Sequence, residues 1–128
     1  MEDALKVLFL EDTDFDIDLV KRFIASRSGF ELTCLGSESE ALQFLKSELP
    51  DIFLVHTVIQ GDAVHNLVEM AIKKGLARVV IPVAAGASLE ELRFYKGLGC
   101  SQILSKPFTI EDLAHAFDSI IAQPARVQ

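Results

Sequence analysis

Leu5-Lys6-Val7-Leu8-Phe9-Leu10-Glu11-Asp12 is the stretch of sequence that decides the fold. Its short apolar run predicts a strand that is covered on both faces, and the two acids mark the carboxyl end of that strand. Four further strands are expected, at Phe30–Leu35, Ile52–Val55, Arg78–Ala84 and Gln102–Leu104. Helical patterns separate these runs, and this alternation predicts an α/β protein with a parallel sheet.

The ends of the helices are marked as clearly as the strands. Ser37 and Ser88 each precede a glutamate by three residues, which is the capping-box pattern of a helix start. Glycines stand where helices are expected to end, at positions 29, 75 and 99. The first helix is expected to bury Phe15, Leu19 and Phe23, with Ile24 as a further candidate. The last helix is expected to bury Leu113, Ala116, Phe117, Ile120 and Ile121.

Pro82 falls inside the fourth expected strand. Proline cannot donate a hydrogen bond to the neighbouring strand, so we expect a bulge or a shortened strand at this position.

Composition favours one small domain. A chain of 128 residues with 50% hydrophobic content needs only one core, which we expect over residues 1–122, with 123–128 as a tail or linker. The formal charge of −7 opposes direct binding to nucleic acid, whose surface is anionic. No apolar run is long enough to cross a membrane, and the start of the chain lacks a basic signal region. Cys34 and Cys100 are isolated, as expected of reduced thiols, and a cytoplasmic location follows as the expectation.

Polar residues follow three of the expected strands, and this end of a doubly wound sheet is where ligands bind. Glu11 and Asp12 follow the first strand, His56 ends Pro50-Asp51-Ile52-Phe53-Leu54-Val55-His56, and Lys106-Pro107-Phe108 follows the last. In this order, from Leu5 to Ile121, these segments resemble the receiver domain of two-component response regulators. The resemblance implies a flavodoxin-like, doubly wound five-stranded parallel sheet of order 2-1-3-4-5, with helices on both faces.

The resemblance also implies roles for particular residues. Receivers hold Mg²⁺ with the acid pair, here Glu11 and Asp12, and with a backbone carbonyl that falls on Val58. The lysine that contacts the phosphoryl group falls on Lys106. His56 stands where the family has its phosphoacceptor aspartate.

Two further positions depart from the family pattern. Ala84 replaces the Ser/Thr after the fourth strand, and Ile103 replaces the switching aromatic of the fifth. Together with His56, these changes predict a degenerate receiver, or pseudo-receiver, that is not phosphorylated at the usual site. Loss of a carboxylate also predicts that any Mg²⁺ binding is weakened, so no cofactor is expected.

His56 has several open interpretations. We expect it to pair with Asp12 or Glu11 and to close the pocket without chemistry. The alternatives are that the pocket of acids and His56 binds a small ligand or a metal such as Zn²⁺ or Mn²⁺, since imidazole suits these ions, or that His56 is itself phosphorylated. Phosphorylation of another acid, Asp14 or Asp62, is a further alternative. Solvent-facing positions are expected for Thr57, His65 and His115.

Catalysis finds no support in the sequence, which has neither a nucleophile–base–orienter set nor a glycine-rich cofactor loop, so we expect no enzyme. The expected function is that of a protein-interaction and regulatory module in bacterial-type phosphorelay signalling. Its partner would be a sensor kinase, an effector domain or a second receiver. By resemblance, the face formed by the fourth helix, fifth strand and fifth helix makes such contacts, including those of a homodimer. On this face we expect Leu92, Phe94, Tyr95 and Lys96.

Overall fold

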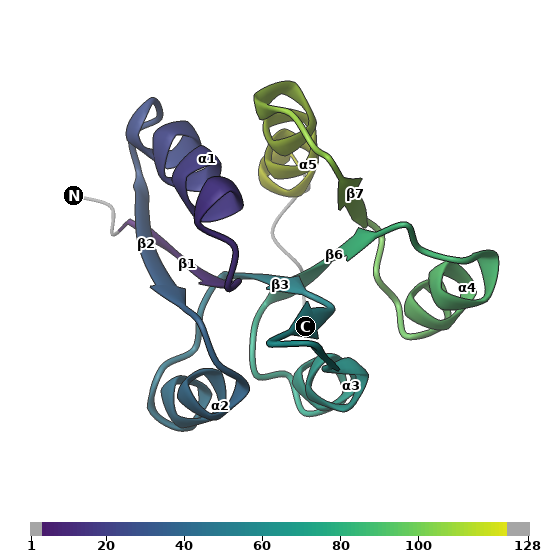
Figure 1. Cartoon of the computed structure of the whole chain (residues 1–128). Coiled ribbons are helices and arrows are strands. Elements are labelled where there is room, and N and C mark those ends of the chain that lie inside the picture. The colour runs from purple at the N-terminus through teal and green to yellow at the C-terminus, as the bar shows by residue number, and fades with distance from the viewer. Residues whose placement is uncertain (1–3, 123–128) are drawn as a thin grey trace.

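A five-stranded parallel sheet forms the centre of the molecule (Figure 1). The computed structural model describes residues 4–122, and the expected tail at 123–128 lies outside the described residues. The strands of the sheet are β1 (Leu5–Leu10), β2 (Phe30–Leu35), β3 (Ile52–His56), β6 (Val79–Ala85) and β7 (Leu104–Lys106). Their order is β2-β1-β3-β6-β7, so the predicted order 2-1-3-4-5 is confirmed.

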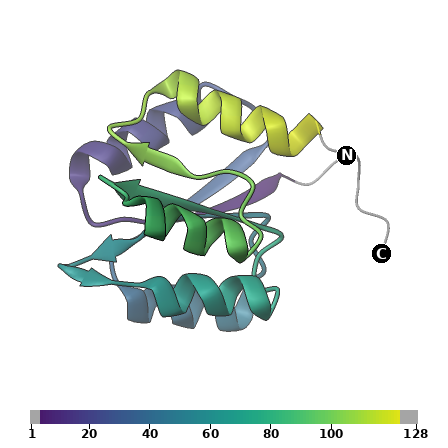
Figure 2. The same ribbon diagram turned by 90° about the vertical axis from the view of Figure 1, so that its right-hand side faces the viewer.

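Helices cover both faces of this sheet, as predicted. One face carries α1 (Asp14–Ala25) and α5 (Ile110–Ala122). The other carries α2 (Glu38–Ser47), α3 (His65–Lys73) and α4 (Leu89–Gly97), and Figure 2 shows these layers from the side. None of the helices in residues 4–122 is both long enough and apolar enough to cross a bilayer.

The strands divide their side chains between two cores, which is why their apolar runs are nearly continuous. Leu8 and Leu10 of β1 pack with Phe53 of β3 in the core under α2 and α3. Val7 and Phe9 alternate with them and pack in the core under α1 and α5. All four β1 side chains are at most 1% exposed, so β1 lies at the centre of both cores.

The first two strands have the predicted bounds, whereas the last is shifted by two residues. It was expected at Gln102–Leu104 and runs over Leu104–Lys106, where it pairs with Val83–Ala85 of β6. Ile103 therefore precedes the strand. A short edge strand has little alternation to fix its register, so the sequence alone places it poorly.

Pro82 causes neither a bulge nor a shortening, and that prediction is wrong. Val55 pairs with Pro82 in an unbroken register between β3 and β6. Val79 N–H donates to Asp51 and Thr57 N–H donates to the Val83 carbonyl, so odd-numbered residues of β6 face β3. Pro82 faces the other way, toward β7, whose pairing begins only at Val83. The missing N–H therefore removes no bond from the sheet.

The buried face of α1 differs from the prediction by one residue. Phe23 and Ile24 are buried as expected, but Phe15 is 74% exposed, and Asp16 and Val20 are buried although neither was predicted to be. In α5, Leu113 and Phe117 are buried as expected, but Ile121 is 48% exposed. The placement of Phe15 was wrong because a buried charge, Asp16, occupies the helical position that an apolar residue would normally take.

A short hairpin follows β3 that the sequence analysis did not predict. β4 (Val58–Ile59) pairs antiparallel with β5 (Asp62–Ala63), and Gln60-Gly61 forms the turn. Both turn residues have positive φ, 52° for Gln60 and 83° for Gly61, which is the geometry of a type I′ two-residue turn. The expected helix starts are present: the Ser37 and Ser88 hydroxyls accept from the N–H of Glu40 and Glu91.

Candidate functional site

The carboxyl ends of β1, β3 and β7 bring three of the predicted site residues together. Glu11 directly follows β1, His56 is the last residue of β3, and Lys106 is the last residue of β7. The arrowheads of β6 and β7 in Figure 2 point to this end of the sheet, where the β4–β5 hairpin also lies. We refer to Glu11, Asp12, Asp16, His56 and Lys106 as the polar pocket.

Glu11 lies at the centre of the polar pocket and is completely buried. Its Oε2 accepts hydrogen bonds of 3.2 Å from the backbone N–H of Asp12 and of Thr13. His56 Nδ1 lies 3.0 Å from the same oxygen, and Lys106 Nζ lies 2.9 Å from Oε1. Burial alone raises the pKa of Glu11, but the hydrogen bonds and charges of His56 and Lys106 outweigh it and lower the pKa from 4.5 to about 2. Glu11 is therefore ionised at neutral pH.

Lys106 joins two buried carboxylates. Its Nζ lies 2.7 Å from Asp16 Oδ2 as well as 2.9 Å from Glu11 Oε1. Burial lowers the pKa of Lys106, but the hydrogen bonds to Asp16 and Glu11 outweigh burial and raise it. The cation that a receiver would use on a phosphoryl group is here already paired with acids of the chain.

The sequence analysis missed Asp16. An acid in the first turn of a helix is expected to be solvated and to complement the helix dipole, and Asp16 fits that description. Its burial depends on Lys106, which is 90 residues away in the sequence. A mismatch in the apolar stripe of α1, where Asp16 precedes Val20 by one helical turn, was the available signal.

His56 is buried, and one of its ring nitrogens has no partner. The residue is 9% exposed, and Nε2 makes no hydrogen bond to any of the described residues. Nδ1 lies 3.4 Å from Lys106 Nζ in addition to its contact with Glu11. A proton on Nδ1 faces Glu11 and leaves a lone pair on Nε2, whereas a proton on Nε2 leaves an unsatisfied N–H. In either tautomer, an unpaired polar atom remains at the position that the resemblance to receivers aligns with their phosphoacceptor.

Asp12 lies at the exposed rim of the polar pocket and holds the hairpin. Its Oδ2 accepts the N–H of Gln60 at 2.7 Å. Single ligand atoms of Glu11, Asp12 and His56 lie within 4.8 Å of one another, which is close enough for one metal ion. Val58, whose carbonyl the resemblance adds to the site, begins β4 and is 41% exposed.

This donor set fits Mg²⁺ poorly. Mg²⁺ prefers hard oxygen ligands, whereas one of the three groups is an imidazole nitrogen. The oxygens of Glu11 already face Lys106, His56 and two backbone N–H groups. Only the carboxylate of Asp12 reaches the rim.

Ala84 and Ile103, at the two positions that depart from the receiver switch, have no polar atoms in their side chains. Ala84 is 1% exposed and lies in β6 opposite Ser105 of β7. Ile103 packs, half-buried, against the core under α2 and α3. Neither side chain can hydrogen-bond to a group in the polar pocket.

The remaining candidates lie outside the polar pocket. Asp14 is exposed at the start of α1, and Asp62 is exposed in β5. Thr57 was expected at the surface, but it is 1% exposed. It follows β3 into the interior, where its N–H donates to Val83 and its carbonyl accepts from Val64.

The expected contact surface of α4 is corrected at Tyr95. This residue is completely buried, because the helix turns it into the core under α3, whereas Phe94 is 39% exposed. Lys96 is exposed and Leu92 is half-buried. His65 was expected to face solvent, but its Nδ1 makes a short hydrogen bond with the Tyr95 hydroxyl. His115 is exposed, as expected.

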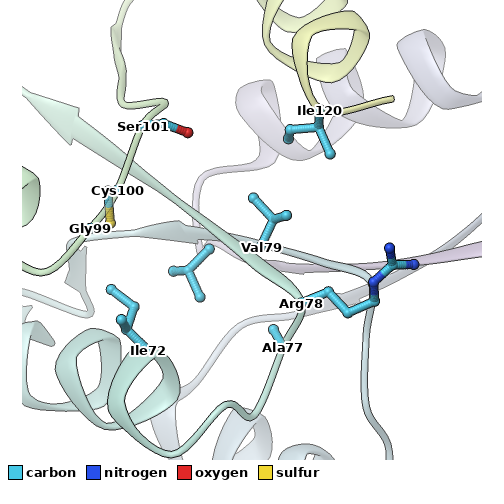
Figure 3. A pocket seen from close by; sticks show the side chains of 9 residues that line it. Ile72, Ala77, Arg78, Val79, Gly99, Cys100, Ser101 and Ile120 are labelled. Carbon is cyan, nitrogen blue, oxygen red and sulfur yellow. The ribbon is translucent and has the colours of Figure 1, made fainter. Parts of the chain in front are cut away.

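A separate hollow of about 130 Å³ lies at the opposite end of the sheet (Figure 3). Cys100 and Ser101 lie on one side of it, Ile120 of α5 above, and Val79 of β6 between them. Burial raises the pKa of the Cys100 thiol to about 11, so the thiol is protonated and unreactive at neutral pH. Arg78 pairs with Asp51 at 3.1 Å. The hollow offers no group suited to catalysis among the residues that line it.

Comparison with known proteins gives the same fold. The chain is 27% identical over 112 residues to Sporulation initiation phosphotransferase F of Bacillus subtilis (strain 168), which covers 87% of this chain and 89% of that protein. No protein-family model matches the chain.

Solved structures match over nearly the whole chain. A CheY-like response regulator receiver domain protein of Methanospirillum hungatei has a TM-score of 0.82 at 22% identity, covering 93% of this chain and 94% of that one. The non-phosphorylated HemR receiver domain of Leptospira biflexa has a TM-score of 0.82 at 18% identity, covering 98% and 100%. At these identities the comparison establishes the fold, and the polar pocket has to be interpreted from its own residues.

Proposed function

We propose that this chain, which has the fold of response regulator receiver domains, is an atypical receiver of two-component phosphorelay signalling that is not phosphorylated at position 56. The contact between His56 Nδ1 and Glu11 Oε2, 3.0 Å long, carries this proposal. His56 stands at the position where a receiver presents its acceptor carboxylate, and its Nδ1 faces Glu11. The polar pocket thus contains a side-chain pairing where the active family has a nucleophile.

The charges of the polar pocket support the same conclusion. Transfer of a phosphoryl group depends on cations that neutralise the charge developing on its oxygens. Lys106 is shared between Glu11 and Asp16, and the donor set fits Mg²⁺ poorly. An incoming phosphoryl group would therefore meet three carboxylates and a cation that is already paired.

We propose further that the domain is not an enzyme and acts in the cytoplasm by binding another protein. A sensor kinase, an effector domain or a second receiver would be the partner, as in the receiver family. The formal charge of −7 opposes direct contact with nucleic acid.

Treatment with acetyl phosphate and Mg²⁺, followed by intact-protein mass spectrometry, tests the proposal. We expect no phosphoryl adduct on the native chain. The control is His56→Asp, which restores an oxygen nucleophile beside Lys106 and should acquire an adduct if the rest of the polar pocket is competent. A stoichiometric adduct that peptide mapping places on His56 would refute the proposal, whereas an adduct on Asp14 or Asp62 would identify an active receiver that uses another acceptor.

A metal site is the second candidate function, and the unpartnered Nε2 of His56 favours it. A donor set that combines an imidazole with carboxylates suits Zn²⁺ and Mn²⁺ better than Mg²⁺, because Mg²⁺ prefers oxygen ligands throughout. Titration calorimetry with each ion should then show saturable binding of Zn²⁺ or Mn²⁺ that Asp12→Asn weakens and His56→Ala abolishes. Absence of heat and of any thermal shift would remove this candidate.

A further inference from the structure

A groove between α3 and α4 lies outside the polar pocket and has a volume of about 650 Å³. This is within the usual range of binding clefts, roughly 300–1,000 Å³. The residues that matter to its chemistry are Val58, His65, Glu69, Glu90, Glu91 and Phe94. They come from the hairpin, from α3 and from the first turns of α4.

Exposed apolar side chains line part of this groove. Phe94 is 39% exposed and Val58 is 41% exposed, although both are large hydrophobic residues. The ring of His65 lies edge-on to Phe94, with centroids 5.8 Å apart. An exposed aromatic and an exposed aliphatic residue that line one groove form the kind of surface that anchors a partner side chain.

The buried side chain of Tyr95 fixes the positions of His65 and Phe94, the two aromatic rings of the groove. Tyr95, completely buried, contacts both neighbours: its hydroxyl hydrogen-bonds to His65 Nδ1, and its ring centroid lies 5.2 Å from that of Phe94. Burial raises the pKa of Tyr95, so the hydroxyl remains neutral and keeps its proton for this bond. A surface fixed in this way loses little freedom when a partner binds.

The charged residues that line the groove are all acidic, apart from His65. Glu69, Glu90 and Glu91 line it, and no lysine or arginine is among the lining residues. Glu69 pairs with Lys73 at 2.7 Å on the exposed side of α3, and Glu91 lies 3.9 Å from His65. Glu90 makes no ion pair within the described part of the chain. Complementarity therefore requires a cationic partner.

We propose that the groove between α3 and α4 binds a basic segment of a partner protein. One apolar side chain of that segment packs on Phe94 and Val58, and its lysines or arginines face Glu69, Glu90 and Glu91. A second copy of this chain fits less well, because its own net charge is −7. The proposal rests on the proposed function in that it treats the domain as a protein-binding module. It places the contact on the α3 side of α4, where the structure turns Phe94 outward and Tyr95 inward.

A labelled model peptide tests this proposal on the full chain. The peptide is an amphipathic helix with lysines on one face and leucines and one phenylalanine on the other. Its binding is measured by fluorescence anisotropy, and amide NMR maps the contact. A mirror peptide with glutamates in place of the lysines is the control for charge. We expect saturable shifts at Val58, His65 and Phe94, with the lysine peptide only.

Matched variants separate the groove from general attraction to an acidic domain. Glu90→Lys and Glu111→Lys each reverse an exposed charge in the first turn of a helix, α4 and α5 respectively. We expect the first to weaken binding by about fivefold or more and the second by less than about twofold. Phe94→Ala should weaken binding on the order of 10-fold, whereas Phe15→Ala, an exposed phenylalanine on α1, should leave it unchanged.

Each other outcome overturns the proposal. Equal losses from Glu90→Lys and Glu111→Lys would mean that only net charge attracts the peptide. Groove shifts that appear on concentrating the protein without peptide would identify a second copy as the occupant. The acetyl phosphate experiment separates this inference from the proposed function. If the chain acquires a phosphoryl adduct and the groove still binds the peptide, only the unphosphorylated state is refuted. If the chain acquires no adduct and the groove does not bind the peptide, only the groove proposal is refuted.

Discussion

Replacing Lys106 by methionine removes the ammonium that lies between two buried carboxylates while keeping most of the side-chain volume. The Nζ atom is 2.9 Å from Glu11 Oε1 and 2.7 Å from Asp16 Oδ2. All three side chains are shielded, with 14% of Lys106, 11% of Asp16 and none of Glu11 exposed. Water cannot take the place of the lost cation without rearrangement of the polar pocket.

Two independent energies set the expected loss in the free energy of unfolding. Removing one partner of a buried ion pair costs about 3–5 kcal/mol. The pKa of Glu11 falls from 4.5 to about 2, which at about 1.4 kcal/mol per unit is roughly 3–4 kcal/mol, of which Lys106 supplies one part and His56 the other. We therefore expect Lys106→Met to lower the free energy of unfolding by about 3 kcal/mol at pH 7, and Tm by roughly 10 °C.

The loss should depend on pH in a definite direction. In the native chain the pKa of Glu11 is depressed, so its stabilisation is complete above pH 4.5 and disappears as the pH falls toward 2. In Lys106→Met, burial is no longer opposed by the ammonium, so the pKa of Glu11 rises and the carboxyl takes up a proton more readily. The difference between the two proteins should therefore shrink as the pH falls from 7 to 4.

Urea denaturation at several pH values measures both effects. The double variant Lys106→Met/Glu11→Gln is the control, because it removes the buried charge together with its partner and should be more stable than Lys106→Met alone. A single variant that loses less than about 0.5 kcal/mol, with the same loss at pH 4 and pH 7, would show that the carboxylates are hydrated and that the reasoning is wrong.

Three further predictions concern single groups. Glu11→Gln should remove the part of the acid sensitivity that falls between pH 4.5 and 2, measured as the slope of unfolding free energy against pH. Tyr95→Phe removes the hydroxyl bound to His65 and should lower the unfolding free energy by about 1 kcal/mol, measured in urea at pH 7. Cys100, whose pKa is raised to about 11, should resist alkylation at pH 8 in the native state and react in urea, as mass spectrometry would show.

The fold was predictable because its signals are local and repeated. The apolar run of β1 indicates a strand covered on both faces, and serine–glutamate pairs at Ser37 and Ser88 mark helix starts that do not depend on the rest of the molecule. The meeting of Glu11, His56 and Lys106 was predictable for the same reason, since parallel strands end at one edge.

The errors arise where a distant contact overrides a local pattern. Asp16 is buried because Lys106 lies above it, and this shifts the buried face of α1 and exposes Phe15. The orientation of Tyr95 depends on His65 in another helix. The hairpin had a local signal that was not used: a glycine after Gln60, between residues able to pair as strands, favours a type I′ turn.

The backbone N–H of Gln60 competes with any cation for the carboxylate of Asp12. The 2.7 Å bond occupies Oδ2 of the carboxylate that lies at the rim. A hydrogen bond to a charged group contributes about 1.5–3 kcal/mol, so an ion that takes this oxygen binds roughly 10- to 100-fold more weakly than to a free aspartate. Cation binding and closure of the β4–β5 turn are therefore thermodynamically linked, because both use the same oxygen of Asp12. Substitutions at Gly61 that loosen the turn should strengthen metal binding, although Gly61 is not a metal ligand.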